Sequence, residues 1–512
     1  HKQMVYYICK VYKKYALERR AIPLVFSDLF FIYAFLAANL LCCAFSRNLR
    51  VQNAVLLAFS LAFYAWGEPV YLLLLIGVAL VDFLCARAVW LGRHKRPRRF
   101  PLILACVLTL GALAVFKYTG FFARTAQSLT GWPAVIPQIA LPIGISFYTF
   151  QALSYVVDVY RGEVEPERSF ARFLMYVSLF HQCVAGPIVR YADVAQEIVS
   201  RRVERSDLSD GITRFTVGLG KKVLLANTCG LIADTALMTE SAASDVTKLN
   251  DNLAALSARP VLLLWLGVIA YMLQIYLDFS AYSDMAIGMG RMVGFHYKEN
   301  FRYPYMARSV RDFWHRWHIS LSGFFRDYVY IPLGGSRRGM GRTLLNMLIV
   351  WALTGLWHGA SWNFVLWGLW FFLLLAIERL FLGKWLERHP AVGHIGTLFA
   401  VLFSWVLFRF RELPLCLAVL RGMFGLNGNP FSSFETGSLW LNYLFFLPVA
   451  ILACTPLLHN LHTALARRAR TDGGGVTALL AVTETLAPPA LLLLSTAALV
   501  GNSYNPFLYF QF

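Results

Sequence analysis

The stretch TLLNMLIVWALTGLWHG, residues 343–359, decides the fold class of this chain. It contains no charged residue, and its length approaches the roughly 20 apolar residues that cross a bilayer as a helix. His358 lies near its end, and an ionisable side chain at membrane depth is costly, so by default it marks a functional site. The stretch therefore predicts a membrane helix that carries a functional histidine.

The composition extends this interpretation to the whole chain. Of its 512 residues, 58% are hydrophobic and 15% are charged, whereas a soluble domain has about 25% charged residues. Apolar runs recur along the sequence, and we expect about 11 to 13 membrane-embedded segments. They lie near residues 28–46, 52–66, 69–90, 100–122, 138–160, 170–186, 212–238, 260–290, 343–358, 363–383, 394–410, 437–459 and 476–500. The predicted fold class is an all-α polytopic membrane protein.

The charge distribution agrees with this class. The net charge is +19, from 47 Lys and Arg against 28 Asp and Glu, and basic clusters occur between apolar runs at 92–100, 201–205 and 467–470. Short basic loops are typical of the cytoplasmic side of a membrane protein. We expect no nucleic-acid partner, because the basic residues lie between predicted spans rather than on a soluble domain.

A basic, aromatic-rich segment precedes the histidine helix. Residues 301–342 contain eight arginines and two aspartates, so they predict an interfacial or re-entrant helix rather than a lipid-facing span. Ser309 begins the sequence S-V-R-D, a capping-box pattern that predicts a helix start. Spacings of three and four residues then predict one apolar helical face, made of Phe313, Trp317, Leu321, Phe324 and Tyr328. The arginines face either phospholipid headgroups or an anionic substrate such as the phosphates of coenzyme A.

Polar residues also occur inside other apolar runs. Gly186-Pro187 should end a helix and expose backbone groups, which at membrane depth must be buried in protein or line a wet cavity. The run QIYLDFSAYSDMAIGMG, residues 274–290, places Asp278 and Tyr282 within a long span, together with further polar groups. This density indicates either a solvated interior path or a structural polar network between helices.

Three histidines allow two kinds of chemistry. His315, His318 and His358 could supply three ligands to a metal ion, but no carboxylate or cysteine is placed as a fourth ligand, and Arg316 would repel a cation. A general base fits His358 better, since a desolvated histidine stays neutral at pH 7 and accepts a proton from a hydroxyl. A serine-hydrolase mechanism has no support, because the chain lacks G-x-S-x-G. We expect histidine-dependent transfer chemistry in a membrane cavity, without a metal.

The motifs together resemble a known family. The chain is similar to the membrane-bound O-acyltransferases (MBOAT), and within them to the alginate O-acetyltransferase AlgI group. The resemblance rests on the stretches VFSDLFF, FYAWGEP, FKYTGFF, LPIGISFYTFQALSYVVDVYRG, AGPIVRY, QIYLDFSAYSDMAIGMGRMVGF, NFRYPYMARSVRDFWHRWHISLSGFFRDYVYIPLGGSRRG, GLWHGASWNFVLWG and SYNPFLYFQF. It covers residues 24–512 in order. It implies a single MBOAT membrane domain there, preceded by an extension at 1–23 outside the family pattern.

The resemblance also implies an architecture and a reaction. The fold would be an MBOAT-type helical bundle, with re-entrant or interfacial helices around a funnel that meets mid-membrane. His358, the histidine of GLWHG, would be catalytic there, and His318, in HRWHISL, is the second histidine of the family pattern. Acetyl groups would come from a cytoplasmic thioester, acetyl-CoA, as the donor substrate, with no bound cofactor.

We expect the following roles at the site. His358 deprotonates an acceptor hydroxyl, while His318 orients His358 or helps to stabilise the oxyanion. The residues expected near the donor phosphates are Arg316, Arg326 and Arg337. The residues expected along the substrate path are Asp278, Tyr282 and Trp357.

The implied surroundings are those of polysaccharide O-acetylation. The protein would cross the bacterial cytoplasmic (inner) membrane several times, in contact with membrane lipid. Its acceptor would be a cell-surface or exported polysaccharide, as in alginate biosynthesis, and a separate exported acetyltransferase of the SGNH type would be its partner. One alternative is DltB-like D-alanyl transfer from a carrier protein in teichoic acid D-alanylation. Another is a transporter or scaffold, in which His358 is structural or relays protons.

Overall fold

The computed structural model describes residues 24–91, 99–131, 139–183, 186–239, 246–472, 474–501 and 504–506. Over these ranges the chain forms helices joined by turns and contains no β-strand. The all-α prediction is therefore confirmed. The predicted N-terminal extension at 1–23 and most of the basic loop at 92–100 lie outside the described residues.

Internal contacts divide the chain into two compact units. Of the described residues, the first unit contains 24–219, 282–299 and 494–505, and the second contains 220–281, 300–493 and Pro506. The division falls within one long helix, α12, which runs from Val261 to Met292.

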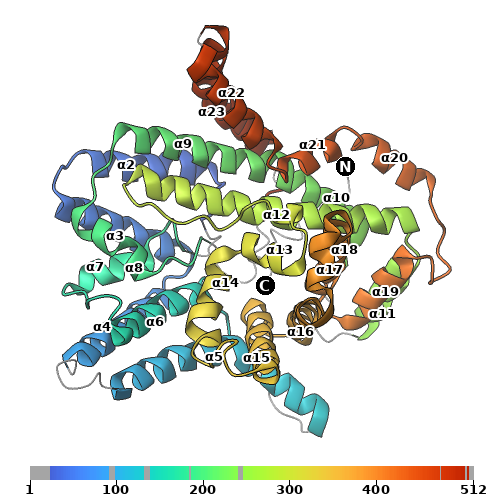
Figure 1. Ribbon diagram of the computed structural model, residues 1–512, viewed down its shortest axis with the longest axis horizontal. Coiled ribbons are helices and arrows are strands. Elements are labelled where there is room, and N and C mark those ends of the chain that lie inside the picture. The colour runs from blue at the N-terminus through green and yellow to red at the C-terminus, as the bar shows by residue number, and fades with distance from the viewer. Residues whose placement is uncertain are drawn as a thin grey trace. The chain divides into compact units, whose positions relative to one another are not determined.

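In the first unit, α4 packs against both α5 and α6, and the three helices lie near one another in Figure 1. Gly144 precedes α6 with a φ of 73°, a left-handed conformation that glycine adopts without a steric penalty. The helices of this unit are η1 (Phe31–Leu36), α2 (Ala37–Ala44), α3 (Leu49–Gly67), α4 (Tyr71–Leu91), α5 (Arg99–Thr130), α6 (Ile145–Arg161), α7 (Phe170–Ser178), α8 (Tyr191–Ser200) and α9 (Arg205–Gly220).

The second unit holds the segments that carry the predicted site. Its core is rich in aromatic rings, and Phe313, Trp367, Phe371 and Trp405 are almost completely buried. Its helices before the site are η2 (Lys221–Ala226), α10 (Asn227–Leu237) and α11 (Val246–Ser257). Those of the site are η3 (Pro304–Met306), α13 (Val310–Arg316), α14 (Ile319–Phe325), η4 (Arg326–Tyr330), α15 (Met340–His358) and α16 (Trp362–Ile377). The remainder are η5 (Glu378–Leu382), α17 (Gly383–Arg388), α18 (Pro390–Arg409), α19 (Leu413–Met423), α20 (Phe434–Asn442), α21 (Phe446–Ala453), α22 (Leu457–Asp472) and α23 (Gly475–Gly501).

Seven helices of the described chain are long and apolar enough to cross a membrane. They are Leu49–Gly67, Tyr71–Leu91, Arg99–Thr130, Val261–Met292, Trp362–Arg388, Pro390–Arg409 and Gly475–Gly501. The bent pair α20 and α21, with an angle of 56° between them, would make an eighth span if it crosses as one.

This number is lower than the 11 to 13 embedded segments that the apolar runs predicted, and the reason is physical. Some of those runs form short helices: α7 has nine residues and α2 has eight. Helix α6 has 17 residues, and nearly all of its side chains are buried. An apolar run can thus be buried inside the protein without being long enough to cross a bilayer.

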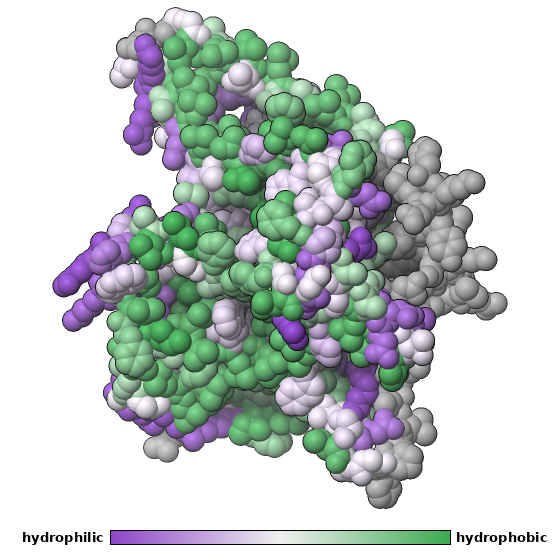
Figure 2. Space-filling view, turned by 90° about the vertical axis from the view of Figure 1, so that its right-hand side faces the viewer, coloured by the Kyte–Doolittle hydropathy of each residue, from purple (hydrophilic) through white to green (hydrophobic). Residues whose placement is uncertain are grey.

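The surface of the protein is itself apolar over wide areas. Figure 2 shows broad regions of hydrophobic side chains on one face, with hydrophilic ones gathered largely toward its edges. On α5, for example, Phe100, Ile103 and Val107 all point outward and are well exposed. A soluble protein rarely exposes contiguous apolar surface of this extent, whereas lipid tails would cover it in a membrane.

Helices α15 and α16 pack closely because glycines line their contact. A Cβ atom at Gly355 would collide with the carbonyl oxygen of Phe364, and one at Gly368 would collide with the carbonyl oxygen of Trp351. The two backbones can therefore approach each other only where side chains are absent. This close contact fixes α15, whose last residue is His358, against α16.

Replacing one of these glycines should destabilise the protein. We expect Gly355→Ala to lower the stability by about 1–3 kcal/mol, since backbone atoms must move to accept the methyl group. The measurement is the thermal unfolding midpoint in detergent. Gly341→Ala, also on α15, is the matched control, because nothing lies within 4 Å of a Cβ there. Equal midpoints for the two variants would contradict the close packing.

Candidate functional site

The arginine-rich segment begins as the sequence predicted. Helix α13 starts after Ser309, whose Oγ accepts a hydrogen bond from the backbone N–H of Asp312 at 3.1 Å. The Asp312 carboxylate in turn accepts from the backbone N–H of Arg308 at 3.1 Å. The serine half of the predicted capping box is thus confirmed, whereas the aspartate binds the N–H of Arg308, one residue before the N-cap.

The prediction of one continuous apolar helix from Phe313 to Tyr328 is wrong. The helix ends at Arg316, and α14 begins at Ile319, after His318 adopts a left-handed conformation with φ at 43°. Two backbone hydrogen bonds hold the break, from Arg302 N–H to the Arg316 carbonyl and from Ile319 N–H to the Asn300 carbonyl, both at 2.9 Å. A helical pattern cannot reveal such a break, because the break depends on hydrogen bonds with Asn300 and Arg302, which precede the predicted helix. The apolar side chains predicted to share a face are nevertheless buried, apart from Tyr328.

His318 lies at this break and is fully buried. Its ring contacts three aromatic side chains, with centroid distances of 4.9 Å to Phe279, 6.4 Å to Phe301 and 5.8 Å to Trp357. Burial lowers the pKa of His318 to about 3, so the imidazole is neutral at pH 7. A left-handed conformation at a residue other than glycine is strained, and such strain is often found at functional sites.

His358 is the last residue of α15 and is only partly buried. Its ring lies 4.9 Å from Trp357, 4.9 Å from Trp367 and 5.3 Å from Phe408, measured between centroids. The two predicted catalytic histidines thus contact the same indole, that of Trp357. The structure brings together three residues that the sequence analysis proposed separately.

A large cavity lies along α15, and its lining on this helix ends at Thr354, short of His358. It has a volume of about 1350 Å³ and lies between α13, α14, α15 and the region from η5 to α17. On α15 it is lined by Met340, Met347, Val350, Trp351 and Thr354. Residues four apart share one face of a helix, so Thr354 lies one turn before His358 on the same face.

The cavity is strongly basic. Its cationic lining residues are Arg308, Arg311, Arg326, Arg379 and Lys384, and His315 lines it as well. Two carboxylates also line it, and one of them, Glu378, accepts hydrogen bonds from the backbone N–H groups of Val310 and Arg311 at the start of α13. A cavity with this excess of positive charge attracts anionic ligands.

Of the arginines predicted near the donor, only Arg326 lines this cavity, and it also pairs with Asp327 at 2.7 Å. Arg316 instead forms an ion pair with Asp312 at 2.7 Å. Arg337 is exposed in the turn after η4. The sequence analysis did not select Arg308 and Arg311, because no pattern distinguishes them from the other arginines of the segment, and Arg379 and Lys384 come near the segment only in the folded chain.

The residues predicted along a substrate path have different surroundings. Asp278 forms an ion pair with Lys222 at 2.8 Å, and both side chains are buried. Tyr282, in the first unit, donates a hydrogen bond to the Cys183 carbonyl at 2.8 Å. Trp357 lies beside the two histidines. The polar groups of α12 therefore resemble the structural network that the sequence left open as an alternative.

The described residues contain no group of three or more His, Cys, Asp or Glu side chains placed to hold a metal ion. His315 faces the basic cavity, whereas His318 is packed among aromatic rings. His315 thus has surroundings separate from those of His318 and His358, which share the Trp357 ring.

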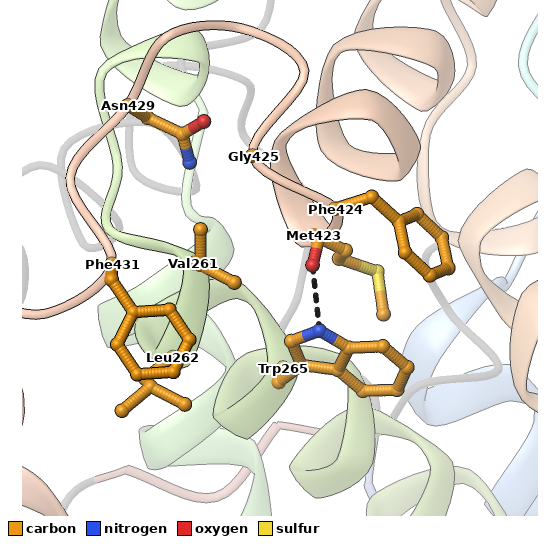
Figure 3. A pocket seen from close by; sticks show the side chains of 8 residues that line it. All are labelled: Val261, Leu262, Trp265, Met423, Phe424, Gly425, Asn429 and Phe431. Carbon is orange, nitrogen blue, oxygen red and sulfur yellow. Dashed lines mark hydrogen bonds between the residues drawn. The ribbon is translucent and has the colours of Figure 1, made fainter.

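A second, smaller pocket of about 400 Å³ lies between the start of α12 and the end of α19. The Trp265 Nε1 donates a hydrogen bond to the Met423 carbonyl at 2.7 Å across it, as Figure 3 shows. Its lining residues are Val261, Leu262, Trp265, Met423, Phe424, Gly425, Asn429 and Phe431. None of these side chains is titratable, so the basic cavity is the better candidate for chemistry.

The apolar surface and the long helices define a multi-pass helical membrane protein, which holds a basic cavity and two histidines that contact one indole. The sequence profile of the membrane-bound O-acyltransferase family, MBOAT, matches residues 162–419. This chain belongs to that family and is an O-acyltransferase.

The chain is similar to named relatives over most of its length. A "Probable alginate O-acetylase AlgI" of Pseudomonas putida is 34% identical, over 96% of this chain and 100% of its own. A protein of the same name from Azotobacter vinelandii is 35% identical, with the same coverage. The "Peptidoglycan O-acetyltransferase" of Helicobacter pylori is 31% identical, over 80% of this chain and 81% of its own.

Proposed function

We propose that this protein transfers acetyl groups from acetyl-CoA on the cytoplasmic side for O-acetylation of a cell-surface or exported polysaccharide. The observation that carries the proposal is the basic cavity that runs along α15 to the turn before His358. Coenzyme A brings three phosphate groups, which match the arginines at the cavity wall, and a thioester that must reach a base. The names of the relatives, which refer to alginate and to peptidoglycan, support a glycan as the acceptor.

The proposed reaction needs one base and one leaving group. His358 takes the proton of an acceptor hydroxyl, and the hydroxyl oxygen forms a bond to the acetyl carbonyl carbon. The bond between that carbon and sulfur then breaks, and the proton passes to the departing sulfur, which leaves as the thiol of coenzyme A. The rings of Trp357, Trp367 and Phe408 around His358 exclude water that would otherwise hydrolyse the thioester.

The location and the partner complete the proposal. The protein lies in the bacterial inner membrane, with a funnel on each side of a mid-membrane histidine. A separate exported acetyltransferase of the SGNH type receives the acetyl group and passes it to the polysaccharide. Among the supporting observations are the bacterial relatives and the candidate spans.

Labelled acetyl-CoA tests the donor. Purified protein in detergent should release free coenzyme A and label an added acceptor. The D-alanyl thioester of a carrier protein should not serve as a donor. Turnover of the carrier thioester without turnover of acetyl-CoA would reject acetyl transfer and favour D-alanyl transfer. If neither donor reacts in the presence of membranes that contain the partner, the transferase proposal fails.

The basic cavity also predicts which arginines bind the donor. We expect Arg311→Glu to raise the KM for acetyl-CoA about tenfold, since one charge-assisted contact to phosphate is lost. The kcat should change by less than about threefold, because the phosphates lie away from the reacting carbon. Steady-state kinetics with labelled acetyl-CoA measures both constants.

Arg337→Glu is the matched control for this variant. The same charge is reversed there on an exposed turn outside the cavity. Its KM should stay near the wild-type value. An equal increase for both variants would indicate a general surface effect and would count against the cavity as the donor site.

A further inference from the structure

Asn300 is buried and binds the two backbone N–H groups that directly follow His318. Its carbonyl oxygen accepts a hydrogen bond from the Ile319 N–H at 2.9 Å. Its side-chain Oδ1 accepts from the Ser320 N–H at 3.1 Å and from the Ser320 hydroxyl at 2.9 Å. The same Oδ1 lies 3.2 Å from Nδ1 of His318. Asn300 thus holds the strained turn and the imidazole together.

The backbone N–H of Ser320 identifies the Asn300 atom that faces the ring. An N–H group can only donate, so the side-chain atom beside it must be the amide oxygen rather than the amide nitrogen. That oxygen can only accept, so Nδ1 of His318 must carry the hydrogen between them. Because the buried ring is neutral, its other nitrogen, Nε2, keeps a lone pair.

The Nε2 atom of His318 is buried as well. Among the described residues it has no hydrogen-bond partner. A buried acceptor that stays unsatisfied costs free energy, and native proteins seldom retain one without a function. A reacting group that donates a hydrogen bond would remove this cost when it binds.

We propose that Asn300 is a positioning residue that holds His318 in the form protonated at Nδ1, so that Nε2 acts as a hydrogen-bond acceptor toward the reacting groups. The inference rests on the transferase function proposed above. An acceptor Nε2 also distinguishes the two roles expected for His318, which are to orient His358 and to stabilise the oxyanion. An oxyanion needs a donor, which this form lacks at Nε2, whereas an acceptor nitrogen can orient a hydroxyl or an imidazole N–H.

Nitrogen-15 NMR of histidine-labelled protein in detergent micelles reads the tautomer directly. The signals of His318 are assigned by their loss in His318→Gln. We expect the wild type to carry its hydrogen on Nδ1 and the Asn300→Leu variant to lose this preference. Asn300→Asp should keep it, because a carboxylate oxygen accepts the same bonds. Asn346→Leu replaces another buried asparagine, on α15, and should leave the His318 signals unchanged.

Kinetics adds a second readout of the same variants. We expect Asn300→Leu to lower kcat on the order of 10²-fold, without a change in the KM for acetyl-CoA. The Asn300→Asp variant should recover most of the rate. A positioning role predicts this rescue, whereas loss of folding would lower the amount of active protein and leave kcat per active site unchanged.

The outcomes distinguish this proposal from the proposed function. A wild-type signal with hydrogen on Nε2, or an unchanged tautomer in Asn300→Leu, overturns the role of Asn300. If Asn300→Leu does not fold, the wild-type signal still shows which nitrogen of His318 carries the hydrogen, and so still tests the role of Asn300. If the wild type turns over no acetyl thioester but shows the Nδ1 form, the transferase proposal fails while the assignment of Asn300 stands.

Discussion

His358→Ala is expected to reduce acetyl transfer by about 10²–10⁴-fold, the range usually lost with a general base. The ring lies at the end of α15, within 5.3 Å of three aromatic rings and one turn beyond the basic cavity. Because it is only partly buried, its removal should leave the fold intact. The measurement is release of coenzyme A by purified protein, with the unfolding midpoint recorded in parallel.

Two variants sharpen this test. His358→Gln keeps much of the side-chain volume but cannot act as a base, so it should be as inactive as the alanine variant. His389→Ala removes an exposed histidine that stacks on Trp385, and it should retain the wild-type rate. A His358→Ala protein that keeps more than about a tenth of the wild-type rate would reject the base role. Such a result would revive the transporter or scaffold alternative.

Lys222→Met is expected to lower the stability by about 3–5 kcal/mol, because it leaves the Asp278 carboxylate buried without its cation. The ion pair is 2.8 Å long, and its two side chains are only 4% and 2% exposed. The Lys222 ammonium also donates to Oδ1 of Asn227 at 2.9 Å and to the Pro506 carbonyl. Thermal unfolding in detergent measures the loss.

The neighbouring lysine supplies the control. Lys221 donates to the Ser280 hydroxyl at 3.1 Å and is more exposed, so Lys221→Met should cost less than about 1.5 kcal/mol. The double variant Lys222→Met with Asp278→Leu removes both charges and should recover most of the stability. If the double variant is as unstable as the single one, the burial of charge is not the cause.

The double variant also tests the predicted substrate path. An Asp278 that serves only as the partner of Lys222 can be replaced without loss of acetyl transfer once the protein is stable. A stable double variant that fails to transfer acetyl groups would support the path predicted from the sequence. The structure favours the first outcome, because the carboxylate is engaged by a buried ammonium.

The local features of this protein could be predicted from the sequence because they depend on near neighbours in the chain. The start of α13 at Ser309 follows from hydrogen bonds within four residues. The apolar run before His358 forms α15, Met340–His358, because backbone groups in an apolar surrounding are satisfied within a helix. The long runs at 69–90 and 260–290 form candidate spans, whereas α15 forms as a helix but is not among the candidate spans of the described residues.

Features that join distant segments could not be predicted in this way. The basic cavity brings Arg308, before α13, together with Arg379 and Lys384, about 70 residues later in the chain, and no spacing in the sequence connects the two regions. The break at His318 depends on two hydrogen bonds, one that the Asn300 carbonyl accepts from Ile319 and one that the Arg302 N–H donates to Arg316. Helical periodicity in the sequence indicates only which side chains share a face. The predicted helix therefore extended across the position of the break.

By itself, the sequence determined a helical membrane enzyme of the O-acyltransferase family and indicated His358 and His318. Only the tertiary structure decided that both rings contact Trp357, that Asn300 lies beside Nδ1 of His318, and which cations line the cavity. The physical reason is the range of the interactions. Hydrophobic pattern and helix capping act over a few residues, whereas a site is made where the packing of remote helices brings polar groups within hydrogen-bond distance.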